Sequence, residues 1–202
     1  MAKAKARKSK PTTPARGDAA RARVLILLSG GIDSACALAA YRADRHPASA
    51  LFVDYGQPAR RSERVAAEAI ARHYRVPLST VKLGVGLPGD NGEFFGRNAL
   101  LVLLGGAIES NRPLIVALGI HSASPYYDTT STFASDAQRV LDGYAKGAIT
   151  LGAPFLTLTK QTVVDYARRH RVPLRLTYSC ERRNAPACGE CPSCGDRSAF
   201  GV

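Results

Sequence analysis

Long hydrophobic runs are absent from this sequence. No stretch approaches the ~18 consecutive apolar residues that cross a bilayer, and this excludes a membrane-spanning helix. The apolar run from Val24 to Leu28 is too short for the core of a secretory signal. Because 46% of the 202 residues are apolar and 22% are charged, we expect one globular, cytoplasmic domain with a sizeable core.

Acidic residues are also scarce. The chain has 16 Asp and Glu against 28 Lys and Arg, a net charge of +12, and more than half of this excess lies in residues 1–23. This segment is rich in Ala, Lys, Arg, Pro and Thr, so it is predicted to be a disordered basic tail. Contact with RNA or an acidic partner and simple solubilisation are both compatible with it. An organellar transit peptide is a further alternative, which its two prolines disfavour.

Expected strands and helices alternate from residue 24 to residue 158. Apolar runs that end at a glycine or polar residue are typical of strands buried on both faces of a parallel sheet. The sequence therefore predicts an α/β fold with a Rossmann-like parallel sheet over residues 24–176. Strands are expected at 24–28, 50–53, 78–83 and 114–118 and within 149–158. Helices are expected at 33–43, 59–74, 97–109 and 133–146, and a last helix from Thr159 or Gln161 to 170. Long loops are expected at 85–96 and 119–132, and irregular chain is expected from Thr177.

Four of the expected strands end at Ser29, Asp54, Gly84 and Gly119. Ligands of parallel α/β sheets bind beyond the carboxyl ends of the strands. The sequence therefore predicts that the functional site lies where these four positions meet.

The segment Ser29-Gly30-Gly31-Ile32-Asp33-Ser34 separates the first strand from the first helix. Its glycines let backbone N–H groups approach an anion, its hydroxyls add donors, and the positive end of the following helix faces the same point. No Lys follows the second glycine, so it is not a Walker loop, and it does not match Gly-x-Gly-x-x-Gly. We interpret it as a phosphate-binding loop; the alternative is a helix start capped by Asp33 or Ser34.

Four of the five cysteines lie within fifteen residues of each other. This crowding, in a chain expected in the reducing cytosol, favours metal binding over disulfides. A closed zinc site in segment 177–202 is predicted; an iron–sulfur cluster is the alternative, but position 198 of a ferredoxin-type run is Ser. Cys36 is expected to be a buried structural thiol. The predicted zinc ligands are Cys180, Cys188, Cys191 and Cys194.

These motifs resemble two nested families. Ser-Gly-Gly-x-Asp-Ser is similar to the signature of the PP-loop ATP pyrophosphatases, which split ATP between its α and β phosphates and adenylate a substrate oxygen. With this loop, segments 52–57, 96–98, 154–160 and 177–197 resemble motifs of the 7-cyano-7-deazaguanine synthase (QueC) family. The resemblance implies an adenine nucleotide alpha hydrolase-like fold and a homodimer. It also implies a carbon–nitrogen ligase of queuosine biosynthesis, which uses ATP and ammonia to convert 7-carboxy-7-deazaguanine to the nitrile through an amide.

The resemblance also implies roles for particular side chains, with Mg²⁺ expected on the triphosphate. Lys160 and Arg97 could instead be solvated cations at helix starts, with no contact to phosphate or carboxylate. Asp54 and Gln57 could instead be ordinary turn residues that do not bind the nucleotide. The role of His121 is open. The expected catalytic residues are Asp33, Lys160 and Arg97; the expected nucleotide-binding residues are Ser29, Gly30, Gly31, Asp33, Ser34, Asp54 and Gln57; the expected substrate-binding residues are Asn98, Tyr126 and Asp128.

The chain departs from the QueC pattern at the expected substrate loop. Tyr126 and Asp128 keep register with the family's Tyr and Asp, but the family's Cys and Arg are missing, and Glu181 stands where an aromatic residue is usual. The acceptor is therefore open: a QueC-like antiviral defence enzyme would stop at the amide or use a protein amine. Two other classes are alternatives, a PP-loop tRNA-modifying enzyme and a binding module with a vestigial ATP site.

Overall fold

The computed structural model describes residues 21–84, 92–109, 111–122 and 125–202. Most of the predicted disordered tail and of the expected loop at 85–96 therefore lie outside the described residues. Within the described part of the chain, no helix is long and apolar enough to cross a membrane.

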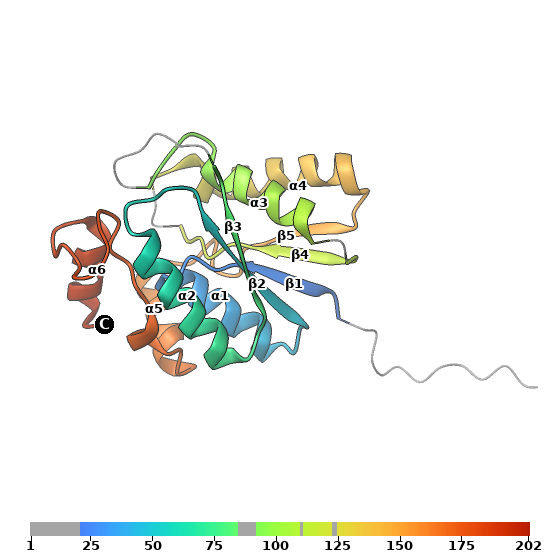
Figure 1. Cartoon of the computed structure of the whole chain (residues 1–202). Helices are drawn as coiled ribbons and strands as arrows, with labels where there is room; N and C mark the ends of the chain where they lie inside the picture. Colours follow the sequence, from blue (N-terminus) through green and yellow to red (C-terminus); the bar gives the residue numbers. More distant parts are fainter. Residues whose placement is uncertain (1–20, 85–91, 110, 123–124) are drawn as a thin grey trace, which may run out of the picture.

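Five parallel strands form one sheet in the order β3-β2-β1-β4-β5 (Figure 1). The strands are β1 (Arg23–Leu27), β2 (Ala48–Asp54), β3 (Leu78–Lys82), β4 (Leu114–Ala117) and β5 (Ile149–Gly152). The predicted parallel α/β fold is thereby confirmed. Strand β1 lies between β2 and β4. The chain adds β2 and β3 on one side of β1 and then crosses back to add β4 and β5 on the other side, so the strand order reverses at β1. A ligand crevice is expected at the carboxyl end of such a strand.

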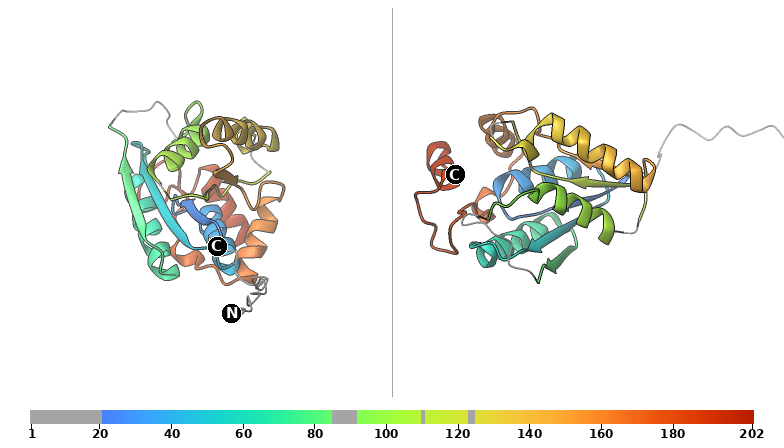
Figure 2. Two further views of the ribbon diagram at one scale, coloured as in Figure 1. Left: turned by 90° about the vertical axis from the view of Figure 1, so that its right-hand side faces the viewer. Right: turned by 90° about the horizontal axis from the view of Figure 1, so that it is seen from above.

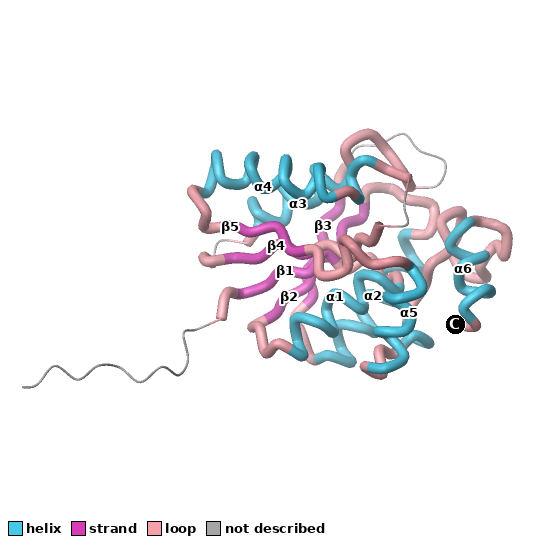
Figure 3. Tube along the Cα trace, turned by 180° about the vertical axis from the view of Figure 1, so that it is seen from behind, coloured by secondary structure: helices cyan, strands magenta, loops and turns pink. Residues whose placement is uncertain are grey.

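Helices cover both faces of the sheet (Figures 1 and 2). One face carries α1 (Ile32–Ala43), α2 (Arg60–Tyr74) and α5 (Lys160–Arg169), and the other carries α3 (Arg97–Ile108) and α4 (Ser131–Ala145). The view from behind in Figure 3 shows the same two layers. Each face has its own apolar core, which holds the strand ends in fixed positions.

Two helix starts depend on threonine caps. The Thr159 hydroxyl accepts from the Thr162 N–H at 3.2 Å, so α5 begins at Lys160, within the predicted range. Thr130 caps α4 in the same way, at 3.1 Å from the Phe133 N–H, and α4 therefore begins at Ser131 rather than at 133. Such caps satisfy N–H groups that have no partner inside the helix.

The prediction of an irregular C-terminus was wrong for one segment. After the short 3₁₀ turn η2 (Leu174–Leu176), helix α6 spans Pro192–Phe200 and ends at Gly201 in the left-handed conformation. Proline in the first turn and glycine just past the end are ordinary helix signals, but α6 has little apolar periodicity to reveal it.

Cys36 lies in α1 and is fully buried, as predicted. Burial raises the pKa of its thiol to about 12. The group is therefore a neutral packing element at physiological pH.

Candidate active site

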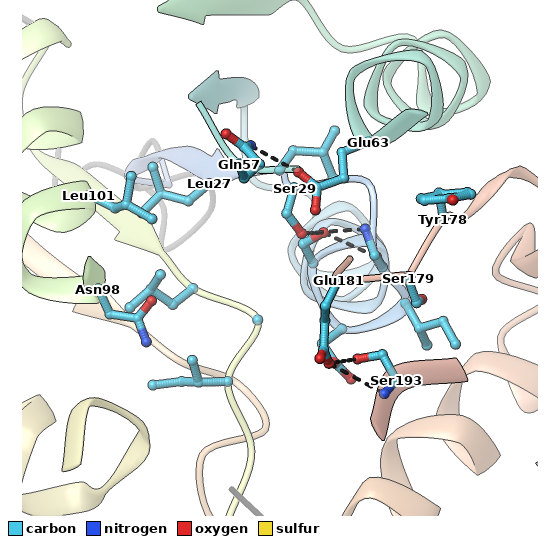
Figure 4. A pocket seen from close by; sticks show the side chains of 18 of the residues that line it. Leu27, Ser29, Gln57, Glu63, Asn98, Leu101, Tyr178, Ser179, Glu181 and Ser193 are labelled. Atoms are coloured by element: carbon cyan, nitrogen blue, oxygen red, sulfur yellow. Dashed lines mark hydrogen bonds between the residues drawn. The ribbon is translucent and has the colours of Figure 1, made fainter. Parts of the chain in front are cut away.

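A cavity of about 270 Å³ opens at the carboxyl ends of the central strands. Figure 4 shows it between α3, which carries Asn98 and Leu101, and a C-terminal wall that carries Tyr178, Ser179 and Glu181. One part of its lining is apolar, whereas the rest carries hydroxyls and charged groups. The apolar part includes Leu27, Leu28, Ile32, Leu51, Phe52, Val53, Leu101, Leu118 and Ile120.

The predicted phosphate loop joins β1 to α1 at this cavity. Gly30 has φ +89°, and a Cβ there would lie 2.4 Å from the Glu63 carbonyl oxygen, so only glycine fits. The Ser29 and Ser34 hydroxyls are 3.1 Å apart. Helix α1 has Gly31 as its N-cap with no side-chain cap, so the alternative of a cap by Asp33 or Ser34 was wrong. An uncapped helix start facing a cavity is a ready anion site.

Asp33 and Lys160 form an ion pair across the cavity floor. The Lys160 ammonium lies 2.8 and 2.7 Å from the two Asp33 carboxylate oxygens. Only 16% of the Lys160 side chain is exposed, so the alternative of a solvated cation was wrong. His121 Nε2 is 3.9 Å from the same carboxylate, and burial is the main reason that the pKa of His121 is lowered.

Gly119 brings the end of β4 against the phosphate loop. A Cβ at this position would lie 2.5 Å from the Asp33 carbonyl carbon and 2.5 Å from the Ser34 nitrogen. The close approach of two backbones fixes the start of α1 relative to the sheet.

Arg97 and Asn98 line the cavity from the start of α3. The Arg97 guanidinium is paired with Glu93 rather than free in solvent. The Asn98 N–H donates to the Asp128 carboxylate at 3.1 Å, and the Asn98 amide donates to the Asp128 carbonyl at 3.0 Å. Asp128 therefore holds the start of α3 and does not line the cavity, and neither does Tyr126, whose exposed fraction is 46%.

The side chains of Asp54 and Gln57 make hydrogen bonds within the turn that follows β2. The Asp54 carboxylate accepts from the Gly56 N–H at 3.0 Å and does not line the cavity. Gln57 does line it, but its amide oxygen accepts from the Tyr55 N–H and its nitrogen donates to the Val53 carbonyl, at 3.0 and 3.1 Å. Both side chains thus shape the turn, which matches the alternative of ordinary turn residues.

Glu63 is a cavity residue that the sequence did not single out. Gln57 Nε2 donates to its carboxylate at 2.9 Å, and Figure 4 shows the Glu63 side chain directed toward Ser29. Burial is the main cause that raises the Glu63 pKa to about 7; the Gln57 bond and the Arg97 charge oppose it. On the sequence, Glu63 looks like one more charged residue in an amphipathic helix.

The C-terminal wall is bonded directly to the phosphate loop. The Tyr178 N–H donates to the Gly30 carbonyl at 2.9 Å, and Asn184 Oδ1 accepts from the N–H groups of Arg61 and Ser62 at 2.9 and 3.0 Å, so it caps α2. Ser193 donates to Glu181 within the wall. Segment 177–197 was singled out for its cysteines and its family resemblance, but no sequence pattern predicted that its other side chains line the cavity.

The four clustered cysteines converge beside this wall. Their sulfur atoms all lie within 4.8 Å of one another, a set that can hold a metal ion. The Cys188 N–H points at the Cys180 sulfur, and the Cys191 N–H at the Cys188 sulfur, at 3.4 and 3.3 Å. Backbone N–H groups aimed at sulfur stabilise thiolates around a metal, so the residues fit a closed four-thiolate site.

The strand order and the loop after β1 define a PP-loop type of α/β protein. The fold resembles that of NMN synthetase from Francisella tularensis, with a TM-score of 0.51 and 16% identity over 85% of this chain and 72% of that one. Residues 23–87 and 94–200 match the family described as "Queuosine biosynthesis protein QueC", and the chain belongs to this family.

Curated relatives agree with the family match. The chain is 27% identical to a 7-cyano-7-deazaguanine synthase of Sulfurihydrogenibium sp. (strain YO3AOP1), over 86% of this chain and 91% of that protein. It is 29% identical to a 7-cyano-7-deazaguanine synthase of Synechococcus sp. (strain RCC307), over 87% and 92%. The resemblance inferred from the motifs is thereby confirmed.

Proposed function

We propose that this protein is an ATP-dependent carbon–nitrogen ligase that acts on 7-carboxy-7-deazaguanine and forms 7-cyano-7-deazaguanine with ammonia. The observation that carries the proposal is the opening of loop 29–34 into a cavity with an apolar wall. Membership of the QueC family and the names of the relatives supply the substrate.

The chemistry requires activation because hydroxide is a poor leaving group from a carboxylate. Adenylation replaces it with AMP, ammonia then gives the amide, and a second adenylation dehydrates the amide to the nitrile. Loop 29–34 would hold the departing pyrophosphate, and Lys160, placed by Asp33, would balance its charge. Mg²⁺ would neutralise part of the triphosphate charge.

The four cysteines would hold Zn²⁺ as a structural ion. Its role would be to supply folding free energy to a segment with few apolar residues. Metal analysis of the purified chain tests this: we expect one zinc per chain and no visible absorption, whereas a brown protein would indicate an iron–sulfur cluster.

The deciding experiment measures AMP and pyrophosphate released from ATP with 7-carboxy-7-deazaguanine, with and without ammonia. We expect substrate-dependent AMP formation and, by mass spectrometry, the nitrile. A product that stops at the amide, or one attached to a protein amine, would keep the activation step and change the acceptor. Absence of any AMP would refute the proposal.

A further inference from the structure

Glu63 combines three properties among the carboxyl groups of the described cavity lining. It lies in the first turn of α2, its side chain faces the cavity beside Ser29, and no cation is paired with it (Figure 4). In contrast, Asp33 is bonded to Lys160 and Glu93 to Arg97.

One carboxylate oxygen of Glu63 is held and the other is available. Gln57 donates to Oε2 at 2.9 Å, and Gln57 is itself fixed by Val53 and Tyr55. Within the described residues, no hydrogen bond or ion pair engages Oε1. The side chain is therefore oriented by one atom and presents the other to a ligand.

Glu63 is also fixed relative to the phosphate loop. Its carbonyl oxygen is 2.4 Å from where a Cβ of Gly30 would be, so the two backbones are in direct contact. Phosphates bound by the loop would place the α-phosphate, and the acyl group joined to it, in the same end of the cavity.

The surroundings of Glu63 suit a group that exchanges protons near neutral pH. Burial raises its pKa to about 7, while the Gln57 hydrogen bond and the Arg97 charge lower it, and Asp54 and Cys180 raise it. Tyr55 faces the same space, and burial raises the pKa of its phenol to about 12, so it stays neutral. A catalytic base works best when its pKa is close to the working pH.

Resting on the proposed function, we infer that Glu63 is the general base that takes the proton from ammonia as it attacks the acyl-adenylate. The nitrogen lone pair forms the new C–N bond, the bond from the acyl carbon to the AMP oxygen breaks, and one N–H proton moves to Glu63 Oε1. Amide, AMP and the Glu63 carboxylic acid result, and the proton then passes to solvent. The adenylation step releases no proton that needs a base, so it does not require Glu63.

The test separates these two steps in the variant Glu63→Gln, which keeps a carbonyl oxygen for Gln57. Adenylation is followed as ATP–pyrophosphate exchange that depends on 7-carboxy-7-deazaguanine, and amidation as product formed from ammonia. We expect exchange within about threefold of the wild type and amidation reduced by roughly 10²-fold or more. Hydroxylamine, which is a stronger nucleophile and largely uncharged at pH 7, should restore acyl transfer.

The controls make each outcome decisive. Glu68→Gln changes an exposed carboxylate of the same helix, paired with Arg64, and should leave both steps unchanged. Equal loss of exchange and amidation in Glu63→Gln, or full amidation, would overturn the inference. In Glu63→Asp, which retracts the carboxylate, amidation should fall while exchange persists. Absence of exchange in the wild type would instead refute the proposed function itself.

Discussion

Lys160 and Asp33 are 127 positions apart in the sequence, yet the ammonium of one contacts both carboxylate oxygens of the other at 2.8 and 2.7 Å. The pair connects the start of α5 to the start of α1, beside the phosphate loop. It fixes a cation at the point where phosphate charge is expected, and it keeps the Asp33 carboxylate from repelling a nucleotide.

Removal of this pair should abolish ATP activation. We expect Lys160→Met and Asp33→Ala each to reduce AMP formation by roughly 10²-fold or more, because a preorganised charge contact is lost. Lys82→Met, at an exposed lysine of the edge strand, is the matched control and should retain activity. Normal AMP release by Lys160→Met would show that the pair is merely structural.

Gly119→Ala should damage nucleotide binding through the backbone. The new methyl group would be 2.5 Å from Asp33 and Ser34 backbone atoms, so the loop must move. We expect at least tenfold weaker ATP binding by calorimetry and a lower melting temperature. Gly143→Ala, which meets no atom within 4 Å in α4, should instead stabilise by up to about 1 kcal/mol; similar effects at both positions would contradict the argument.

Metal removal should weaken ATP binding as well as stability. The cysteine cluster adjoins the segment whose Tyr178 N–H holds the Gly30 carbonyl at 2.9 Å, so loosening one end releases the other. We expect several-fold weaker nucleotide binding in Cys191→Ser or after chelation, with recovery when Zn²⁺ is returned to the chelated protein. An unchanged dissociation constant for ATP after removal of the metal would show that the cysteine cluster does not influence the nucleotide site.

Stability should fall as the pH rises through about 7, because of Glu63. Burial raises the folded-state pKa of its carboxyl group from the ordinary value of 4.5 to about 7. The folded protein therefore binds the proton more tightly than the unfolded chain, and the stability gained below the unfolded pKa is lost on ionisation. Melting temperatures from pH 5 to pH 8 should show this loss in the wild type and in Glu68→Gln but not in Glu63→Gln. Parallel curves for all three proteins would contradict it.

The centre of the sheet could be predicted from the sequence because β1, β2 and β4 contain continuous apolar runs that are followed by small or polar residues. Loop 29–34, Lys160 and the four clustered cysteines could be singled out because each lies in a local motif, and their roles stay predictions. Glu63 has no such motif, and the motif in segment 177–197 does not indicate that this segment lines the cavity, because both reach the cavity only through the packing of α2 and of segment 177–202. Asp54 was expected to bind nucleotide from its place at a strand end, but its carboxylate closes a turn instead.

Asn184 caps α2 and Tyr178 ties down the phosphate loop, so two parts of the domain that lie far apart in the sequence depend on a segment that follows all five strands. The strands can pair with one another without this segment, whereas the cavity gains one of its sides only when the segment has docked. Assembly of the core and assembly of the site are therefore separable steps, and we expect a molecule that has completed only the first to bind nucleotide poorly.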